Sequence, residues 1–182
     1  AALTAGRTRF TAVHRQIATP VFAAIPRWAR WQHMTSPNPP GGILDGARHL
    51  YAVRVYYEDT DLSGITYHAN YLRWFERARS DLVRMLGIDQ RVAVEGGEGA
   101  YAVADLHIRY ARPARLDDTV VIESRCLELG AASVRIHQRA MRDDELIAEQ
   151  TVRVGFIDPQ GRPRRQPAAW RAAFTQFAEG PE

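Results

Sequence analysis

The sequence contains no lysine, so all 24 of its basic residues are arginine. This absence excludes catalysis through a Schiff base on a lysine side chain. Any contact with phosphate groups must then come from arginine, whose forked N–H donors suit phosphate well.

Cysteine is also scarce, because Cys126 is the one cysteine of the chain. A single cysteine excludes an internal disulfide and a cysteine-rich zinc site. Cys126 lies in an apolar run that is typical of a strand, so we expect a buried and unreactive thiol. No apolar run approaches the ~20 residues that a membrane-spanning helix needs, and we expect a soluble, cytoplasmic protein.

Charge is unevenly distributed along the chain. Residues 1–44 hold five arginines and no acidic residue, whereas the other 19 arginines and 21 acidic residues give the remainder a net charge of −2. The formal net charge of +3 therefore comes from the N-terminal segment. A slightly acidic main part argues against a core that binds nucleic acid.

Residues 1–48 differ from the rest of the chain and predict an N-terminal extension. They are basic and poor in acidic residues, and they lead into the proline- and glycine-rich run at 37–42. A targeting segment has a similar composition, but Pro20 interrupts the apolar piece at 17–25, and no clear cleavage site follows it. We expect a disordered or dispensable extension. The alternatives are a chain that truly starts at Met34 and a basic tail that binds a surface.

Residues 49–178 are expected to form one domain, because the apolar content of 46% is enough for a sizeable core. A strand is predicted over residues 49–57, a polar loop over 58–64 and a helix over 69–86. The helix has apolar residues three or four positions apart, which therefore share one face. They are Leu72, Phe75, Ala78, Leu82 and Met85.

The other side of this helix is predicted to be polar. Arg73, Arg77, Asp81 and Arg84 are expected on that side. Glu76 lies at the edge of the apolar face, at salt-bridge spacing from two arginines, so a structural ion pair is the simplest role for it.

Four further strands are predicted over residues 101–111, 119–129, 132–141 and 146–157. A glycine-rich loop at 95–99 precedes them, and a last helix is expected over 167–178. One strand, one long helix and four consecutive strands favour the α+β class, with an antiparallel sheet and a helix packed on it.

Two acidic residues, Asp59 and Asp61, lie in the loop just before the long helix. The free N–H groups at a helix N-terminus favour developing negative charge. A carboxylate that faces those groups across a gap could hydrolyse an activated acyl group, since a thioester needs only an attacking or basic group and oxyanion donors. The simpler role for either residue is a carboxylate that shapes a turn or caps the helix.

Metal and phosphotransfer chemistry fit this loop poorly. Its spacing resembles the start of a calcium loop, but the twelfth position holds Asn70 instead of the required glutamate. Transfer of phosphate to an aspartate is disfavoured because no lysine and no parallel sheet support it. His107 and His137 lie in strands without matching partners, so no metal site is expected.

Several short stretches of the sequence match a known protein family. They are residues 56–61 (YYEDTD), 67–72 (YHANYL) and 76–79 (ERAR), together with Gly64 and a weaker match at 113–118. The segment of about residues 50–170 resembles the hotdog-fold acyl-CoA thioesterases of the 4-hydroxybenzoyl-CoA thioesterase family, in its Tol-Pal-associated bacterial branch. Leu62 and Ser63 stand where a small residue and glycine are usual in that branch. The resemblance implies an antiparallel sheet wrapped around one long central helix. It also implies a homodimer or homotetramer with active sites between subunits.

The resemblance further implies that a short-chain or aromatic acyl-CoA is hydrolysed to the free acid and coenzyme A without a cofactor. An acyl carrier protein is an alternative carrier of the acyl group. Asp61 is the implied catalytic carboxylate, as nucleophile or general base, with N–H groups near His68 as oxyanion donors. His68 is expected to orient water or the thioester, or else to be a polar residue at the helix cap. Tyr57 is expected either to hydrogen-bond near Asp61 or to pack under the sheet.

Two other functions stay open. One is a non-catalytic protein that binds acyl-CoA or acyl carrier protein, or a scaffold linked to the Tol-Pal system. The other is a hotdog dehydratase, in which His68 works with Glu76, eight residues further along the helix. Six arginines are candidates for the phosphates of coenzyme A, each with a solvated surface role as the simpler explanation. They are Arg109, Arg112, Arg115, Arg162, Arg164 and Arg165.

Overall fold

The computed structural model describes residues 39–180, and its compact unit begins at Pro40. Most of the expected N-terminal extension, including Met34, lies outside the described residues. The elements are β1 (Ile43–Asp45), β2 (Arg48–Arg54), the 3-10 turn η3 (Tyr57–Asp59), α1 (His68–Met85), α2 (Gln90–Glu95), β3 (Ala100–Tyr110), β4 (Thr119–Leu129), β5 (Ser133–Arg142), β6 (Glu145–Ile157) and α3 (Ala168–Glu179).

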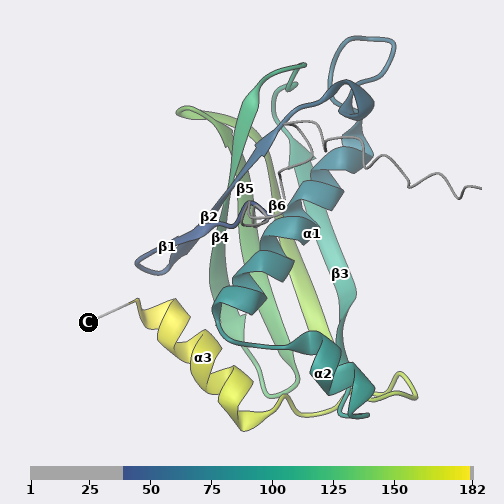
Figure 1. The fold of residues 1–182 in the computed structure, drawn as a ribbon, viewed down its shortest axis with the longest axis vertical. Helices are drawn as coiled ribbons and strands as arrows, with labels where there is room; N and C mark the ends of the chain where they lie inside the picture. The colour runs from purple at the N-terminus through teal and green to yellow at the C-terminus, as the bar shows by residue number, and fades with distance from the viewer. Residues whose placement is uncertain (1–38, 181–182) are drawn as a thin grey trace, which may run out of the picture. The chain divides into compact units, whose positions relative to one another are not determined.

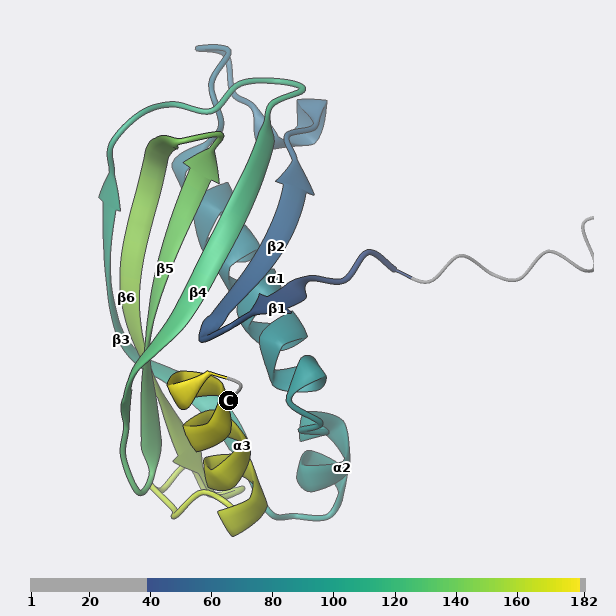
Figure 2. The same cartoon turned by 90° about the vertical axis from the view of Figure 1, so that its left-hand side faces the viewer.

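The six strands form one sheet in the order β1-β2-β4-β5-β6-β3, and every neighbouring pair is antiparallel. Figures 1 and 2 show this sheet curving around α1, with α3 packed at one end. The expected α+β class and the hotdog arrangement of a sheet around one long helix are confirmed. β1 and β3 are the two edge strands, and β3 lies on the far side of the sheet from β1 (Figure 2).

Most of the predicted apolar face of α1 is buried, since Phe75, Ala78 and Leu82 are all 0% exposed. The helix is nevertheless turned slightly from the expected orientation. Trp74 is buried, whereas Met85 is 41% exposed. The buried stripe therefore includes aromatic rings that meet the middle of the sheet.

The prediction that Asp81 lies on a solvated polar side of α1 is wrong, because Asp81 is buried. Its Oδ2 lies 2.9 Å from Nε2 of His49 and accepts a hydrogen bond of 2.7 Å from the backbone N–H of Gly42. A buried carboxylate needs such partners, and they come from residues that precede Asp81 by more than 30 positions. A Cβ on Gly42 would lie 2.4 Å from His49 Nε2, so this close approach requires glycine.

The structured chain starts earlier than residue 49. The backbone N–H of Gly42 donates to the carboxylate of Asp81, and β1 pairs with β2 through Ile43, Leu44 and Asp45. These residues belong to the range that the sequence analysis gave to the extension. A strand of three residues is too short for its alternation to be recognised in the sequence.

The four later strands occur where the sequence predicts them, with one irregularity in β3. A β-bulge falls between Val103 and Asp105, so the alternation expected along this strand breaks at Ala104. Beyond the bulge most of β3 is exposed, including Leu106. α2, which the sequence analysis did not predict, is a single short helix whose N-cap Asp89 accepts a hydrogen bond from Val92 N.

The core has two parts. One lies between the first half of α1 and the sheet, and the other joins the end of α1 to α3 through Phe174. Cys126 is half-buried beside the second part, and this burial raises the pKa of its thiol, as expected for an unreactive cysteine. None of the helices between residues 39 and 180 combines the length and apolarity that crossing a bilayer requires.

Candidate active site

The polar loop before α1 is held by the backbone and side chain of Asp59. Its carboxylate accepts a hydrogen bond of 2.8 Å from Tyr56 N, which closes the 3-10 turn. Its carbonyl oxygen accepts two more, from Tyr67 N at 2.8 Å and from Asn70 Nδ2 at 2.9 Å. Asp59 and the buried Asn70 therefore fix the loop to the first turn of α1, a structural role for both residues.

Asp61 lies at the tip of this loop with an exposed carboxylate. A tight turn places it there, because Gly64 N donates to the Asp61 carbonyl and Gly64 has a φ of +74°. The Asp61 carboxylate accepts hydrogen bonds from the hydroxyl of Ser63 and from Ser63 N, the latter at 2.8 Å. These two bonds lower the pKa of Asp61, so the group is ionised at neutral pH.

Asp61 and His68 line one cavity of about 440 Å³. Its other walls are the loop at Ile65 to Tyr67 and the end of β3 with the segment that follows it. His68 is also the first residue of α1, so the N-terminus of the helix borders this cavity. The N-cap Tyr67 makes no side-chain cap hydrogen bond. The structure thus brings together the acidic loop, His68 and the helix start.

Tyr110 is a residue of this cavity that the sequence analysis did not single out. Its hydroxyl donates a hydrogen bond of 3.1 Å to the carbonyl of His68, and its ring lies edge-on to that of His68 at 6.4 Å. Tyr71 packs against Tyr110 at 5.5 Å and accepts a hydrogen bond of 3.0 Å from Ala114 N. The segment after β3 is thereby fixed to α1, and the weak match at 113–118 was the signal for it.

Tyr57 does not join this group. It is 83% exposed and does not line the cavity, so it does not pack under the sheet. Its backbone carbonyl accepts a hydrogen bond from the hydroxyl of Thr60, which helps to shape the loop.

Glu76 is also separate from His68, because it lines a different cavity, between α1 and the sheet. Its carboxylate accepts a hydrogen bond of 2.6 Å from Ser80 Oγ. The predicted ion pair of Glu76 with a helix arginine is therefore wrong, since Arg79 instead donates to Gln138 Oε1 at 2.8 Å.

The candidate arginines differ in their availability. Arg112 lines the Asp61 cavity, but its Nε lies 2.9 Å from Glu145. Arg109 and Arg162 pair with Glu149 and Asp158. Arg164 donates to the carbonyl of Glu98. The backbone of Arg115 is hydrogen-bonded to Asp118, through both its N–H and its carbonyl oxygen. Within residues 39–180, no three histidine, cysteine or acidic side chains gather as a metal site would require.

Comparison with known proteins identifies relatives of this chain. The profile described as "Thioesterase superfamily" matches residues 63–149. The acyl-CoA thioesterase YbgC of Haemophilus influenzae is 39% identical over 125 residues, which are 68% of this chain and 92% of that protein.

Two solved structures show the same architecture. A "probable thioesterase" from Bartonella henselae superposes with a TM-score of 0.63 at 35% identity, over 66% of this chain and 99% of that one. A thioesterase from Thermus thermophilus, complexed with coenzyme A and zinc, has a TM-score of 0.62 at 26% identity, over 75% of this chain and 98% of that one.

Proposed function

The chain belongs to the thioesterase superfamily as a thioester hydrolase, and we propose that it cleaves short-chain or aromatic acyl-CoA to the free acid and coenzyme A. The observation that carries this proposal is the shared cavity, which has the Asp61 carboxylate on one wall and the N-terminus of α1 on another. The name of the Haemophilus relative, an acyl-CoA thioesterase, supports the choice of carrier.

Asp61 supplies the reactive carboxylate, because it lines the cavity and is ionised at neutral pH. In one route its oxygen attacks the thioester carbonyl carbon, the C–S bond breaks and a mixed anhydride forms, which water then hydrolyses. In the other route Asp61 removes a proton from water, which attacks the same carbon and expels the thiolate. Both routes place negative charge on the carbonyl oxygen.

That charge would be stabilised by backbone N–H groups at the start of α1, near His68 and Ala69. The first N–H groups of a helix lack partners within the helix, and Tyr67 offers no side-chain cap here. His68 would orient the thioester or the water, held in place by the ring and hydroxyl of Tyr110. Tyr57 has no assigned contact with the substrate, since its side chain is exposed and does not line the cavity.

Coenzyme A carries phosphates, and arginines near the mouth of the cavity are the groups that would bind them. Arg112 lines the cavity, and Arg115 lies three residues further along the same segment. The complex of the Thermus relative with coenzyme A supports a site for this ligand in the fold. Acyl carrier protein stays an alternative carrier, and no described contact favours it.

A second copy of the chain would cover the exposed edge of the sheet. β3 carries Val103, Leu106 and Tyr110, which are 52%, 42% and 43% exposed, on an edge strand. Because Tyr110 also lines the Asp61 cavity, pairing along β3 would bring the partner close to the site. The proposed assembly is therefore a homodimer or a homotetramer. The cytoplasmic location and the Tol-Pal link stay predictions.

The direct test is release of free thiol from acetyl-, butyryl- and benzoyl-CoA by the purified protein. Turnover that disappears in Asp61→Asn supports the proposal. A protein that binds these thioesters without releasing thiol would instead be the non-catalytic binding protein. Dehydration of 3-hydroxyacyl thioesters without hydrolysis would point to the dehydratase, although Glu76 and His68 lie on different cavities.

A further inference from the structure

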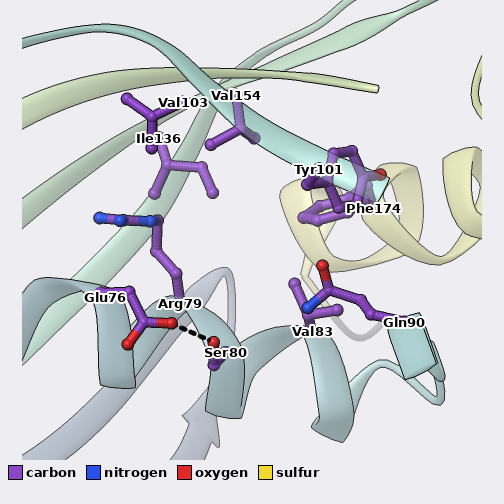
Figure 3. A pocket seen from close by; sticks show the side chains of 10 residues that line it. All are labelled: Glu76, Arg79, Ser80, Val83, Gln90, Tyr101, Val103, Ile136, Val154 and Phe174. Carbon is purple, nitrogen blue, oxygen red and sulfur yellow. Dashed lines mark hydrogen bonds between the residues drawn. The ribbon is translucent and has the colours of Figure 1, made fainter. Parts of the chain in front are cut away.

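A second cavity, of about 130 Å³, lies between the middle of α1 and the strands β3, β5 and β6 (Figure 3). It shares no lining residue with the Asp61 cavity. Its size is close to that of an engineered protein cavity of roughly 150 Å³ that binds benzene. One aromatic ring or a short branched chain is therefore the scale of ligand that it can take.

Most of the wall of this cavity is apolar. Val83 from α1, Ile136 and Val154 from the sheet, and Phe174 from α3 are all buried and line it. Binding of an apolar ligand to such a surface is favourable, because it removes apolar area from water.

The polar residues of the wall are Glu76, Arg79, Ser80 and Gln90, and Arg79 is the one that carries a positive charge. Its guanidinium points toward Ile136 in Figure 3. Arg79 is half-buried, and burial lowers the pKa of its side chain. Between residues 39 and 180, its guanidinium makes one hydrogen bond, from Nη1 to Gln138 Oε1 at 2.8 Å. A guanidinium has five N–H donors, so most of its capacity is unused by these residues.

The arrangement around Arg79 is rigid. Gln138 donates to Phe75 O at 3.0 Å and to Ser124 Oγ at 2.9 Å, and its Oε1 also accepts from Gln150 Nε2 at 2.8 Å. All of these partners are buried, so Gln138 holds the guanidinium at one position.

The charge of Arg79 is neutralised only weakly. Glu76 is the carboxylate whose charge acts on it, but Glu76 is exposed and bonded to Ser80 (Figure 3). A cation taken out of water without a bonded anion is unfavourable. A carboxylate matches the guanidinium in charge and in the spacing of its two oxygens.

We propose that this cavity binds a small organic acid, whose carboxylate pairs with Arg79 and whose apolar body lies against the valine, isoleucine and phenylalanine wall. Benzoate and isovalerate are suitable members of this class. The free acid released from a thioester would belong to it, but the site is separate from Asp61 and does not depend on the proposed hydrolysis. No covalent bond to the protein forms, so the experiment measures affinity.

Isothermal titration with benzoate and with its neutral analogue benzamide tests the proposal. Arg79→Gln should weaken benzoate binding about tenfold or more, because a charge-assisted hydrogen bond is lost. Arg77→Gln is the matched control, since Arg77 is an exposed arginine of the same helix. It should leave the affinity for benzoate unchanged. Benzamide should bind the wild-type protein more weakly than benzoate.

A second variant keeps the test independent of the folding of Arg79→Gln. Val154→Phe would place a ring in the cavity and should abolish benzoate binding while Arg79 keeps its charge. Circular dichroism checks the fold of each variant. Saturable binding of equal strength in wild type, Arg79→Gln and Val154→Phe would put benzoate elsewhere, at the Asp61 cavity for example, and overturn the proposal. No binding to the wild-type protein up to millimolar benzoate would also overturn it.

Discussion

The side-chain amide of Asn70 donates a hydrogen bond of 2.9 Å to the backbone carbonyl of Asp59. This bond joins the first turn of α1 to the loop that carries Asp61. Asn70 is 5% exposed, so the bond is shielded from water and sets the position of the loop. The account therefore assigns Asn70 a positioning role without contact with the substrate.

Asn70→Asp tests this role, because aspartate has the same shape but no N–H donor. Two oxygens would face each other where a hydrogen bond now lies, and we expect a loss of about 1 to 3 kcal/mol in unfolding free energy. The kcat should fall because Asp61 shifts relative to the helix start, whereas KM should change little. Steady-state kinetics and thermal unfolding measure both effects. Unchanged kcat in a stable Asn70→Asp protein would remove Asn70 from the account.

The hydrogen bonds from Ser63 to Asp61 are expected to affect the pH dependence of the reaction. These two hydrogen bonds lower the pKa of Asp61 below the ordinary value of 3.8, so a rate that needs the carboxylate should stay constant from neutral pH down to about 5. Ser63→Ala removes the hydroxyl bond to the charged form, and the pKa of Asp61 should rise. The acid limb of the kcat/KM profile should then move to higher pH. An identical profile in both proteins would argue that Asp61 does not control the rate.

The buried pair of His49 and Asp81 predicts how stability depends on pH. Burial is the main cause that lowers the pKa of His49 below 6.5, and its Nδ1 has no partner among residues 39–180. The unfolded chain therefore binds a proton more readily than the folded one. Stability from this group is complete above about pH 6.5 and is lost as the pH falls below that value.

Urea unfolding between pH 7.5 and 5 measures this dependence. The free energy of unfolding should fall across the interval in the wild-type protein, and His49→Gln should flatten the slope. His107, which is exposed on β3, provides the matched control, because His107→Gln should keep the wild-type slope. Equal slopes in all three proteins would show that the pKa of His49 is not shifted by burial.

The exposed edge strand β3 leads us to expect that the protein is an oligomer. Leu106 is 42% exposed on this edge, and an arginine there would place charge between two paired copies. Light scattering should return at least a dimer mass for the wild-type protein at micromolar concentration and a smaller mass for Leu106→Arg. A monomer mass for the wild-type protein would contradict the proposed assembly.

The sequence predicts those parts of the fold whose signal is local. The long helix and the four later strands follow from apolar periods over ten or more residues. Asp61 and His68 line one cavity, and a tight turn at Asp61 to Gly64 lies in the short segment between them. β1 and α2 were not predicted because three and six residues carry too little periodicity.

Contacts between distant residues were harder to predict. The burial of Asp81 depends on His49, 32 residues earlier, and a charged residue on a helix is ordinarily solvated. Tyr110 reaches the carbonyl of His68 across 42 positions, so only the packing of β3 against the start of α1 brings it into the cavity. Likewise, the bulge at Val103 comes from pairing with β6 and not from the β3 sequence alone.

The central claim is that Asp61 is the catalytic carboxylate. Asp61→Asn keeps the side-chain shape but removes the charge, so kcat for acyl-CoA hydrolysis should fall by roughly 10² to 10⁴, with KM nearly unchanged. Asp59→Asn should lose much less activity, because Asp59 shapes the loop, and His68→Ala should lie between the two. The decisive measurement is kcat of these three variants by thiol release. The account predicts that Asp61→Asn has the lowest value, and near-normal turnover by Asp61→Asn would contradict it.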